Sequence, residues 1–261
     1  MADDSSDSEA IDLFAEPSGY YPPPPQPTTQ THTLLSGQTL HLRLVGHNPL
    51  WGHHLWQAGR LISTYLEKNP DLIRGKTVLE LGAGAGLPSL VCAELGAKKV
   101  VVTDYPDVDL VENLRVNIDN YYSSHEEEVE REGGEKEMIA EGYCWGNDAQ
   151  DLLSHLPAGE LGFEVLILAD LLFNHSEHAK LVATIRKTLK RSKDAKALVF
   201  FSPYRPWLFE KDMAFFELVK EEGFVVENVL EEKMEKVMFE EDRGDEGLRR
   251  TVFGYVVRWK L

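Results

Sequence analysis

The stretch Val78-Leu79-Glu80-Leu81-Gly82-Ala83-Gly84-Ala85-Gly86-Leu87-Pro88 decides the fold. A short, mostly apolar run leads into a glycine-rich loop and then into a helix whose first turn tolerates Pro88. Glycine accepts positive φ and has no side chain, so the backbone of such a loop can approach a ligand closely. The free N–H groups of the following helix favour an anion. The stretch therefore predicts a strand, a ligand-binding loop and a helix, and a glycine turn that binds nothing is the alternative.

Strand-like and helix-like runs alternate along the chain after this stretch. Several of the apolar runs lack polar alternation, as expected for parallel strands that are covered on both faces. Two later runs have no helical pattern between them and predict an antiparallel hairpin. The fold class is therefore α/β, with a doubly wound, mostly parallel seven-stranded sheet that ends in an antiparallel C-terminal hairpin. The predicted strands span residues 78–81, 100–103, 139–145, 165–169, 197–201, 224–229 and 252–259, and the predicted helices span residues 87–95, 108–120, 178–190 and 212–222.

The chain divides into three predicted segments. Residues 1–31 are acidic and then proline-rich, which favours a disordered or extended tail, either a plain one or a docking arm for a partner. Residues 32–74 predict one strand and one helix, because alternating leucines precede an amphipathic run. Residues 75–261 form the predicted catalytic domain, within which residues 126–137 predict a flexible acidic loop.

The net charge of −17 is concentrated in two of these segments. Residues 1–16 hold six acids and no base, and residues 126–137 hold seven Glu against Arg131 and Lys136, a net charge of −5. Together they supply 11 of the 17 negative charges, so the remainder of the chain is only mildly acidic. Binding of a phosphate backbone needs clustered Lys and Arg, which argues against a nucleic-acid partner. A basic protein is the expected partner.

No apolar run approaches the roughly 18 residues of a membrane span, and the acidic start lacks the features of a signal peptide. A monomer in the cytoplasm, without a membrane partner, is therefore expected. Cys92 and Cys144 lie in apolar segments, without the spacing of metal ligands or the density of a disulfide scaffold. Both are expected to be buried packing residues, and no metal site is predicted.

Asp104 follows the second predicted strand, at the edge of the sheet where the glycine loop lies. A carboxylate in this position accepts hydrogen bonds from both hydroxyls of a ribose, which dinucleotides and S-adenosylmethionine share. The dinucleotide pattern Gly-x-Gly-x-x-Gly would need glycine where this chain has Leu87. A branched side chain there hinders close packing of strand and helix beside a pyrophosphate. The loop and Asp104 therefore indicate S-adenosylmethionine. Trp145 closes the third predicted strand, where its ring would stack on adenine or simply fill the core.

Three stretches carry a resemblance to a known family. They are Asn48-Pro49-Leu50-Trp51-Gly52-His53-His54-Leu55-Trp56, the run from Glu80 through Asp104-Tyr105-Pro106-Asp107, and Ala169-Asp170-Leu171-Leu172-Phe173-Asn174-His175-Ser176-Glu177-His178. Here the chain resembles the class I, seven-strand S-adenosylmethionine methyltransferases with a Rossmann-like fold, and within them the group that methylates lysines and N-termini of proteins. With the segment Glu16-Pro17-Ser18-Gly19-Tyr20-Tyr21-Pro22, it is similar over nearly its full length to the fungal enzymes that modify translation elongation factor 1-alpha.

The resemblance implies a protein N-methyltransferase that modifies the N-terminal amine and an adjacent lysine of translation elongation factor 1-alpha. It also implies a set of cofactor-binding residues, some of them by resemblance alone: Trp56, Gly82, Ala83, Gly84, Asp104, Trp145 and Ala169. The chain departs from wider relatives at one place. They often have Asp-x-x-Tyr after the fourth strand, whereas this chain has Phe173 at the last position, which excludes a role for a phenol hydroxyl there.

Asp170 lies at the carboxyl end of the fourth predicted strand, where open α/β sheets place their ligands. Methyl transfer from a sulfonium is an in-line displacement, so the enzyme must align a neutral nitrogen. An α-amine with a pKa of about 7.7 to 8.0 is partly neutral at physiological pH, whereas lysine near about 10.4 is charged. We expect Asp170 to orient the amine and to relay a proton from lysine, with Asn174 and His175 as weaker catalytic candidates. The alternative is that Asn174 or Ser176 caps the next helix and Asp170 supports the loop.

Three other functions fit parts of the sequence. A nucleic-acid methyltransferase would usually need a polar-Pro-Pro-aromatic motif after the fourth strand, and this chain lacks it. A small-molecule methyltransferase would share the glycine loop, because one fold serves many acceptors. A non-catalytic adaptor that retains the fold is the third alternative.

Overall fold

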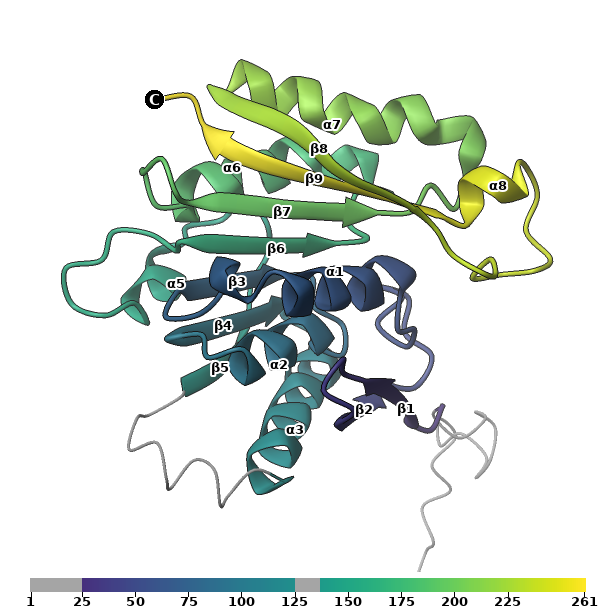
Figure 1. Ribbon diagram of the computed structural model, residues 1–261, viewed down its shortest axis with the longest axis horizontal. Coiled ribbons are helices and arrows are strands. Elements are labelled where there is room, and N and C mark those ends of the chain that lie inside the picture. The colour runs from purple at the N-terminus through teal and green to yellow at the C-terminus, as the bar shows by residue number, and fades with distance from the viewer. Residues whose placement is uncertain (1–24, 125–136) are drawn as a thin grey trace, which may run out of the picture.

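A seven-stranded sheet forms the centre of the computed structural model, which describes residues 25–124 and 137–261 (Figure 1). Its strands are β3 (Thr77–Leu81), β4 (Lys99–Asp104), β5 (Glu137–Gly142), β6 (Val165–Ala169), β7 (Lys196–Phe201), β8 (Phe224–Lys233) and β9 (Thr251–Trp259). They are ordered β5-β4-β3-β6-β7-β9-β8. The first five strands in this order are parallel, and β9 is antiparallel to both of its neighbours. The predicted mostly parallel sheet with an antiparallel hairpin is confirmed.

Helices cover both faces of this sheet. On one face α1 (Gln57–Lys68), α2 (Leu87–Glu94) and α3 (Val108–Ser124) pack against a core that includes Val78 of β3. On the other face α5 (Gln150–Ser154), α6 (His178–Thr188) and α7 (Phe209–Glu221) pack against a core that includes Leu79. Because neighbouring strand residues point to opposite cores, all five residues of β3 are buried. The described chain also contains short helical turns: η1 (Pro70–Leu72), η2 (His175–Glu177), η3 (Pro206–Leu208) and α8 (Glu246–Arg249).

The third predicted strand ends earlier than expected. β5 stops at Gly142, so Trp145 lies in a turn beyond the strand and does not close it. The chain turns at Gly146, which adopts a φ of 84° that glycine accepts without strain. A period-two apolar pattern does not show where such a turn begins, and this explains the error.

The C-terminal hairpin is longer and less regular than the sequence predicts. β8 extends to Lys233 and contains a register shift between Asn228 and Leu230. Between the two strands, the Asp245 side chain accepts a hydrogen bond from the Leu248 N–H at 2.6 Å and begins α8. The expectation of no helix here is wrong, because one capping carboxylate is enough to start a single helical turn.

A separate hairpin precedes the central sheet. β1 (Thr28–Thr33) pairs antiparallel with β2 (Thr39–Leu44), and Thr28 lies opposite Leu44. The predicted tail, residues 1–31, therefore extends too far, because residues 28–31 are part of a strand. This strand has a weak sequence signal, since of its six residues only His32 is buried. Residues 32–74 consequently hold the end of one strand, a second strand and a helix.

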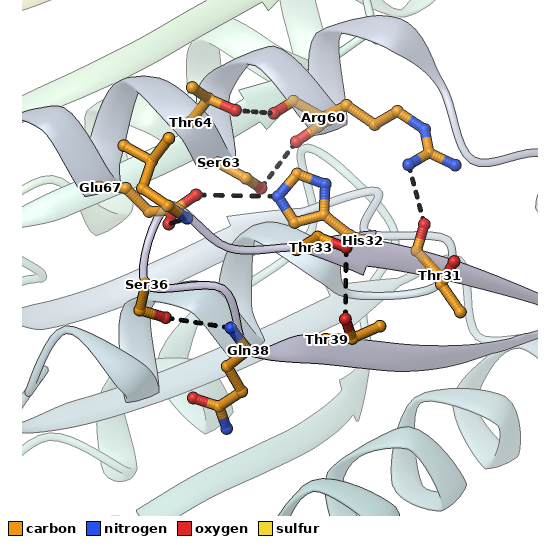
Figure 2. Close-up of polar contacts among 12 residues, drawn as sticks. Thr31, His32, Thr33, Ser36, Gln38, Thr39, Arg60, Ser63, Thr64 and Glu67 are labelled. Carbon is orange, nitrogen blue, oxygen red and sulfur yellow. Dashed lines mark hydrogen bonds and ion pairs between the residues drawn. The ribbon is translucent and has the colours of Figure 1, made fainter.

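Polar contacts dock this hairpin on α1 (Figure 2). A guanidinium nitrogen of Arg60 donates to the Thr31 carbonyl at 3.0 Å, and Glu67 Oε2 accepts from the Leu35 N–H at 2.5 Å. His32 is buried with its Nε2 3.8 Å from Glu67 Oε1, and this burial lowers the pKa of His32. The hairpin is thus fixed to the helix by one buried contact, between His32 and Glu67, and by two exposed hydrogen bonds.

A buried side chain of α3 connects the hairpin to the glycine loop. The Asn117 amide nitrogen donates at 2.9 Å to the Arg43 carbonyl of β2 and at 2.9 Å to the Ala85 carbonyl of the loop. The Asn117 carbonyl oxygen accepts from the Arg43 N–H at 2.8 Å. A buried amide that satisfies several backbone groups in this way fixes their relative positions. The hairpin therefore supports the glycine loop through the Asn117 side chain.

Among the described helices, none has both the length and the apolar character that a membrane crossing requires. The predicted acidic loop, residues 126–137, lies outside the described residues except for Glu137, which begins β5. Residues 1–24 of the predicted tail also lie outside them.

Candidate functional site

The glycine loop joins β3 to α2 as predicted. Gly82, Gly84 and Gly86 adopt φ values of 60°, 58° and 76°, in the left-handed region that glycine tolerates. A Cβ at Gly82 would lie 2.6 Å from the Leu171 side chain, so this position has no room for one. A Cβ at Gly84 would meet nothing within 4 Å, so the backbone there faces open space. A ligand can therefore approach the loop at Gly84.

Asp104 ends β4 directly beside this loop. Its Oδ2 accepts a hydrogen bond from the Gly84 N–H at 2.7 Å, and its Oδ1 accepts one from the Tyr105 N–H at 2.7 Å. Burial raises the pKa of Asp104 above its ordinary value in spite of these donors. A desolvated carboxylate is stabilised by further donors, and the two hydroxyls of a ribose can supply them. The position and chemistry of Asp104 fit the predicted role.

A cavity of about 420 Å³ opens between the loop and the carboxyl ends of β4, β5 and β6. Its volume lies in the range of small-molecule sites. Trp145 borders it with its ring against the loop, since a Cβ at Gly82 would be 3.1 Å from that ring. All of the residues predicted to bind the cofactor line this cavity: Trp56, Gly82, Ala83, Gly84, Asp104, Trp145 and Ala169.

Two further residues on this side of the cavity were not singled out from the sequence. Tyr105 lines the cavity half-exposed, and its place directly after Asp104 is a signal that could have identified it. Glu80 lies buried beneath the loop, where Ser89 donates to its Oε2 through the backbone N–H at 2.9 Å and through its hydroxyl. Burial raises the pKa of Glu80 to about 8, so this carboxyl holds a proton at neutral pH.

Asp170 lines the same cavity at the carboxyl end of β6 and has a φ of 56°. Its Oδ2 accepts from the Ala58 N–H at 2.9 Å and from the Tyr204 hydroxyl at 3.1 Å, and its Oδ1 accepts from the Ser202 N–H at 2.8 Å. Burial raises the pKa of Asp170 to about 7 despite these three donors. The carboxylate thus ties the start of α1 to the ends of β6 and β7. It also titrates near neutral pH, as a proton relay requires.

The two weaker catalytic candidates are separated in the structure. Asn174 lines the cavity, and its Oδ1 accepts from the Ser176 hydroxyl at 3.0 Å. Neither of these side chains caps the helical turns that follow, so the capping alternative is wrong. His175 is not part of the cavity lining, because η2 directs it toward α7, where its Nε2 lies 2.6 Å from Asp212 Oδ1. The structure therefore brings Asn174 to Asp170 at the cavity and leaves His175 outside it.

An aromatic cluster forms where α1 begins. The ring centroid of Trp56 lies 5.0 Å from that of Tyr204 and 5.8 Å from that of Phe239. Trp51 and His54 of the preceding loop extend the cluster, and the Trp56 indole N–H donates to the Trp51 carbonyl at 3.3 Å. Tyr204 and Phe239 lie far from Trp56 in the sequence, so no local pattern could have joined them. The cluster forms one wall beside the cavity and fixes the Trp56 side chain.

The matched family model, described as lysine methyltransferase, covers residues 36–222. The chain belongs to the lysine methyltransferase family. The matched range contains all three stretches that carry the resemblance, and with them the glycine loop, Asp104 and Asp170. S-adenosylmethionine is accordingly the cofactor, and the prediction from the glycine loop is confirmed.

Similar proteins match the enzyme along nearly its whole length. The protein N-terminal and lysine N-methyltransferase efm7 of Neurospora crassa is 52% identical over 260 residues, which cover 98% of this chain and 91% of that protein. The protein of the same name from Schizosaccharomyces pombe is 43% identical over 261 residues, which cover 98% of this chain and 97% of that protein.

Solved structures share the fold at low sequence identity. TYW2 of P. horikoshii in complex with MeSAdo aligns with a TM-score of 0.50 and 19% identity, covering 90% of this chain and 72% of that chain. The T. thermophilus 16S rRNA methyltransferase RsmC, in complex with AdoMet and guanosine, aligns with a TM-score of 0.50 and 16% identity, covering 92% and 52%. At these identities the likeness shows the fold alone.

Proposed function

We propose that this methyltransferase modifies the N-terminal α-amine and an adjacent lysine of translation elongation factor 1-alpha. The observation that carries the proposal is the identity of 41–52%, over nearly the whole chain, to proteins named protein N-terminal and lysine N-methyltransferase. The elongation factor as acceptor rests on the resemblance of the sequence to the fungal enzymes that modify it.

The shape of the cavity favours an acceptor that reaches in from a protein chain. Trp51 and Phe173 line the cavity and expose 47% and 38% of their surface, so this part of the cavity opens to solvent. Asp170 and Asn174 line the same cavity and supply polar groups. An extended N-terminus and a lysine side chain can both reach into a cavity that opens to solvent.

Bound S-adenosylmethionine supplies a methyl group on a sulfonium. The acceptor nitrogen needs a free lone pair, so a lysine ammonium must lose a proton before it can react. Asp170 has an ionised fraction at neutral pH because its pKa is about 7, and in our proposal it takes that proton and orients the amine. Asn174 donates or accepts a second hydrogen bond that fixes the direction of the nitrogen.

The proposed enzyme acts as a monomer in the cytoplasm, where an elongation factor works, and binds neither nucleic acid nor membrane. A net charge of −17 favours a basic protein partner over a phosphate backbone. This charge also predicts that encounter with the acceptor protein becomes slower as salt increases.

Mass spectrometry of the elongation factor from cells that lack this protein tests the proposal. We expect methylation to disappear from both the N-terminal residue and the neighbouring lysine, and to return when the wild-type gene is restored. A gene encoding Asp104→Ala should not restore it. Intact methylation at both positions in the deleted cells would rule out this acceptor. Labelled methyl transfer in a nuclease-treated, desalted extract would then show whether another protein accepts the group.

A further inference from the structure

Among the residues that the structure describes, four carboxyl groups line the cavity, and they belong to Glu80, Asp104, Asp170 and Glu177. Backbone N–H groups donate to each of the first three. Such donors belong to the fold, so a substrate cannot displace them without disturbing the strands and helix starts that carry them. Glu177 differs from the other three because its partner is an exposed side chain, that of Lys180.

Glu177 ends η2 and directly precedes α6. The ammonium nitrogen of Lys180 lies 2.9 Å from Glu177 Oε2 and 3.2 Å from Oε1. The Lys180 side chain is 55% exposed and that of Glu177 25% exposed. Pairs of this kind, three residues apart on a helix surface, are weak because water competes for both partners. A second cation that enters the cavity can therefore displace Lys180 from Glu177.

The cavity that Glu177 lines is partly apolar. Leu50, Trp51 and Phe173 line it with large exposed side chains. Exposed apolar groups that gather at one opening mark a surface that a ligand covers. A lysine side chain needs both features, because its methylene stem packs on apolar groups while its ammonium keeps a polar partner. The combination fits a cationic side chain better than it fits a neutral small molecule.

We propose that Glu177 binds the ammonium of the acceptor that is not reacting, and that this ammonium replaces Lys180. The inference rests on the proposed function, in which an N-terminal amine and a neighbouring lysine are both acceptors. While the α-amine is methylated the lysine stays charged and lies close by, and while the lysine is methylated the α-amine is still largely protonated, because its pKa is about 7.7 to 8.0. Glu177 is then a specificity-determining residue that selects acceptors carrying a second cation next to the reacting nitrogen.

The test compares two synthetic peptides on the full-length enzyme saturated with S-adenosylhomocysteine. The peptides share a free N-terminal glycine and differ only in lysine or glutamine at the second position. We expect the wild-type enzyme to bind the lysine peptide about five-fold more tightly. Glu177→Gln should abolish this preference by lowering the affinity for the lysine peptide alone. Lys180→Met should raise the affinity for the lysine peptide by about two-fold, because Lys180 no longer competes for Glu177. Glu217→Gln breaks a matched pair with Lys220 on α7, 2.8 Å long, and should change neither affinity.

Methylation assays on the same peptides separate this inference from the proposed function. A lysine preference that survives in Glu177→Gln overturns the Glu177 site, whether or not the peptide is methylated. If that variant loses the preference while the wild-type enzyme binds the peptide without methylating it, the site is supported and the proposed function is overturned. Failure of the wild-type enzyme to bind either peptide overturns both.

Discussion

Asp170 both supports the surrounding backbone and carries a titratable carboxylate. Asp170→Asn removes the proton acceptor and keeps one acceptor oxygen, which can serve the Ala58 N–H or the Ser202 N–H but not both, because these groups donate to different carboxylate oxygens. The Tm of the variant therefore has to be measured beside its rates. We expect transfer to lysine to slow by at least about tenfold, and transfer to the α-amine to slow less, because only lysine must shed a proton held at physiological pH. Raising the pH should reduce the difference between the two effects, because more of the lysine is then neutral. The measurement compares methylation rates on two peptides, one with only its α-amine free and one with only its lysine free. If the folded variant methylates both peptides at wild-type rates, Asp170 has no catalytic role.

Tyr204→Phe is the companion variant for this prediction. It removes one donor to Asp170 and leaves the carboxylate and the aromatic ring in place. The Tyr204 hydroxyl lowers the pKa of Asp170 by hydrogen bonding to its ionised form, so its loss should raise that pKa. The acid limb of the pH–rate profile for lysine methylation should then move to higher pH. An unchanged acid limb would show that Asp170 does not take part in the proton transfer.

Asp104→Ala should weaken binding of S-adenosylmethionine severely. The substitution removes a charged acceptor worth about 1.5 to 3 kcal/mol from hydroxyl donors that stay buried, which corresponds to a loss of about ten-fold to 150-fold in affinity. Calorimetry on the folded variant measures the dissociation constant, and Asp71→Ala, at an exposed position, serves as the control. An unchanged dissociation constant for S-adenosylmethionine would show that Asp104 does not bind the cofactor.

Glu80 makes the stability of the fold depend on pH. Its pKa is raised from 4.5 to about 8, so the folded chain keeps a proton that the unfolded chain has lost. Stability from this group is therefore lost as the pH rises from about 4.5 to about 8. Glu80→Gln removes the charge and keeps an acceptor for Ser89, so its Tm relative to wild type should increase with pH across this window. Parallel Tm curves for the two proteins would mean that Glu80 ionises normally.

At the residue scale, the sequence predicts what lies at strand ends and misses what distant segments bring together. The glycine loop, Asp104 and Asp170 follow buried strands, and parallel strands place their carboxyl ends at one edge of the sheet. Tyr204 and Phe239 reach Trp56 from other segments, and only the tertiary fold shows this. The catalytic roles of Asp170 and Asn174 stay predictions, since a lining residue is not thereby a reacting one.

At the scale of elements, Arg60 offers a test of how the first hairpin is held (Figure 2). Its guanidinium donates to the Thr31 carbonyl at 3.0 Å and to Gln30 Oε1 at 2.8 Å. Arg60→Met keeps the packing of the stem and removes both bonds, which should cost about 1 to 3 kcal/mol. Hydrogen exchange should speed up at the amides of β1 and β2 and remain slow in α6 and α7. Arg74→Met is the control, because the Arg74 pair with Asp71 is exposed. Unchanged exchange in the hairpin would mean that apolar packing alone holds it.

The elements that sequence predicts well are those with a long, consistent pattern. The central strands and α1, α2, α3, α6 and α7 carry such patterns, since each is buried over most of its length or along one face. β1 shows too little burial to be recognised, and α5 and α8 are too short to repeat a helical period. These short elements depend on tertiary contacts and single caps, which local patterns do not record.

At the scale of the whole molecule, charge distribution leads to a prediction about residues 126–137. Their sequence, with seven Glu and two consecutive glycines, predicts that the segment is dispensable for chemistry. Replacing it with a short Gly-Ser linker should leave turnover within a few-fold. The rival interpretation is an acidic collar that attracts a basic acceptor. A loss of turnover that disappears at high salt would favour the collar, because salt screens the attraction in the wild-type enzyme as well.

The position of β9 has a consequence for biosynthesis. β9 is translated after β8, yet it lies between β7 and β8 and forms the pairs that join them. As the nascent chain leaves the ribosome, β8 therefore emerges before its neighbour β9. Until β9 arrives, the edge of β7 that pairs with β9 also stays unpaired. Unpaired edges invite aggregation and chaperone binding until a partner strand arrives. The glycine loop and Asp104 have by then been translated, so the residues predicted to bind the cofactor precede the strand that joins β7 to β8.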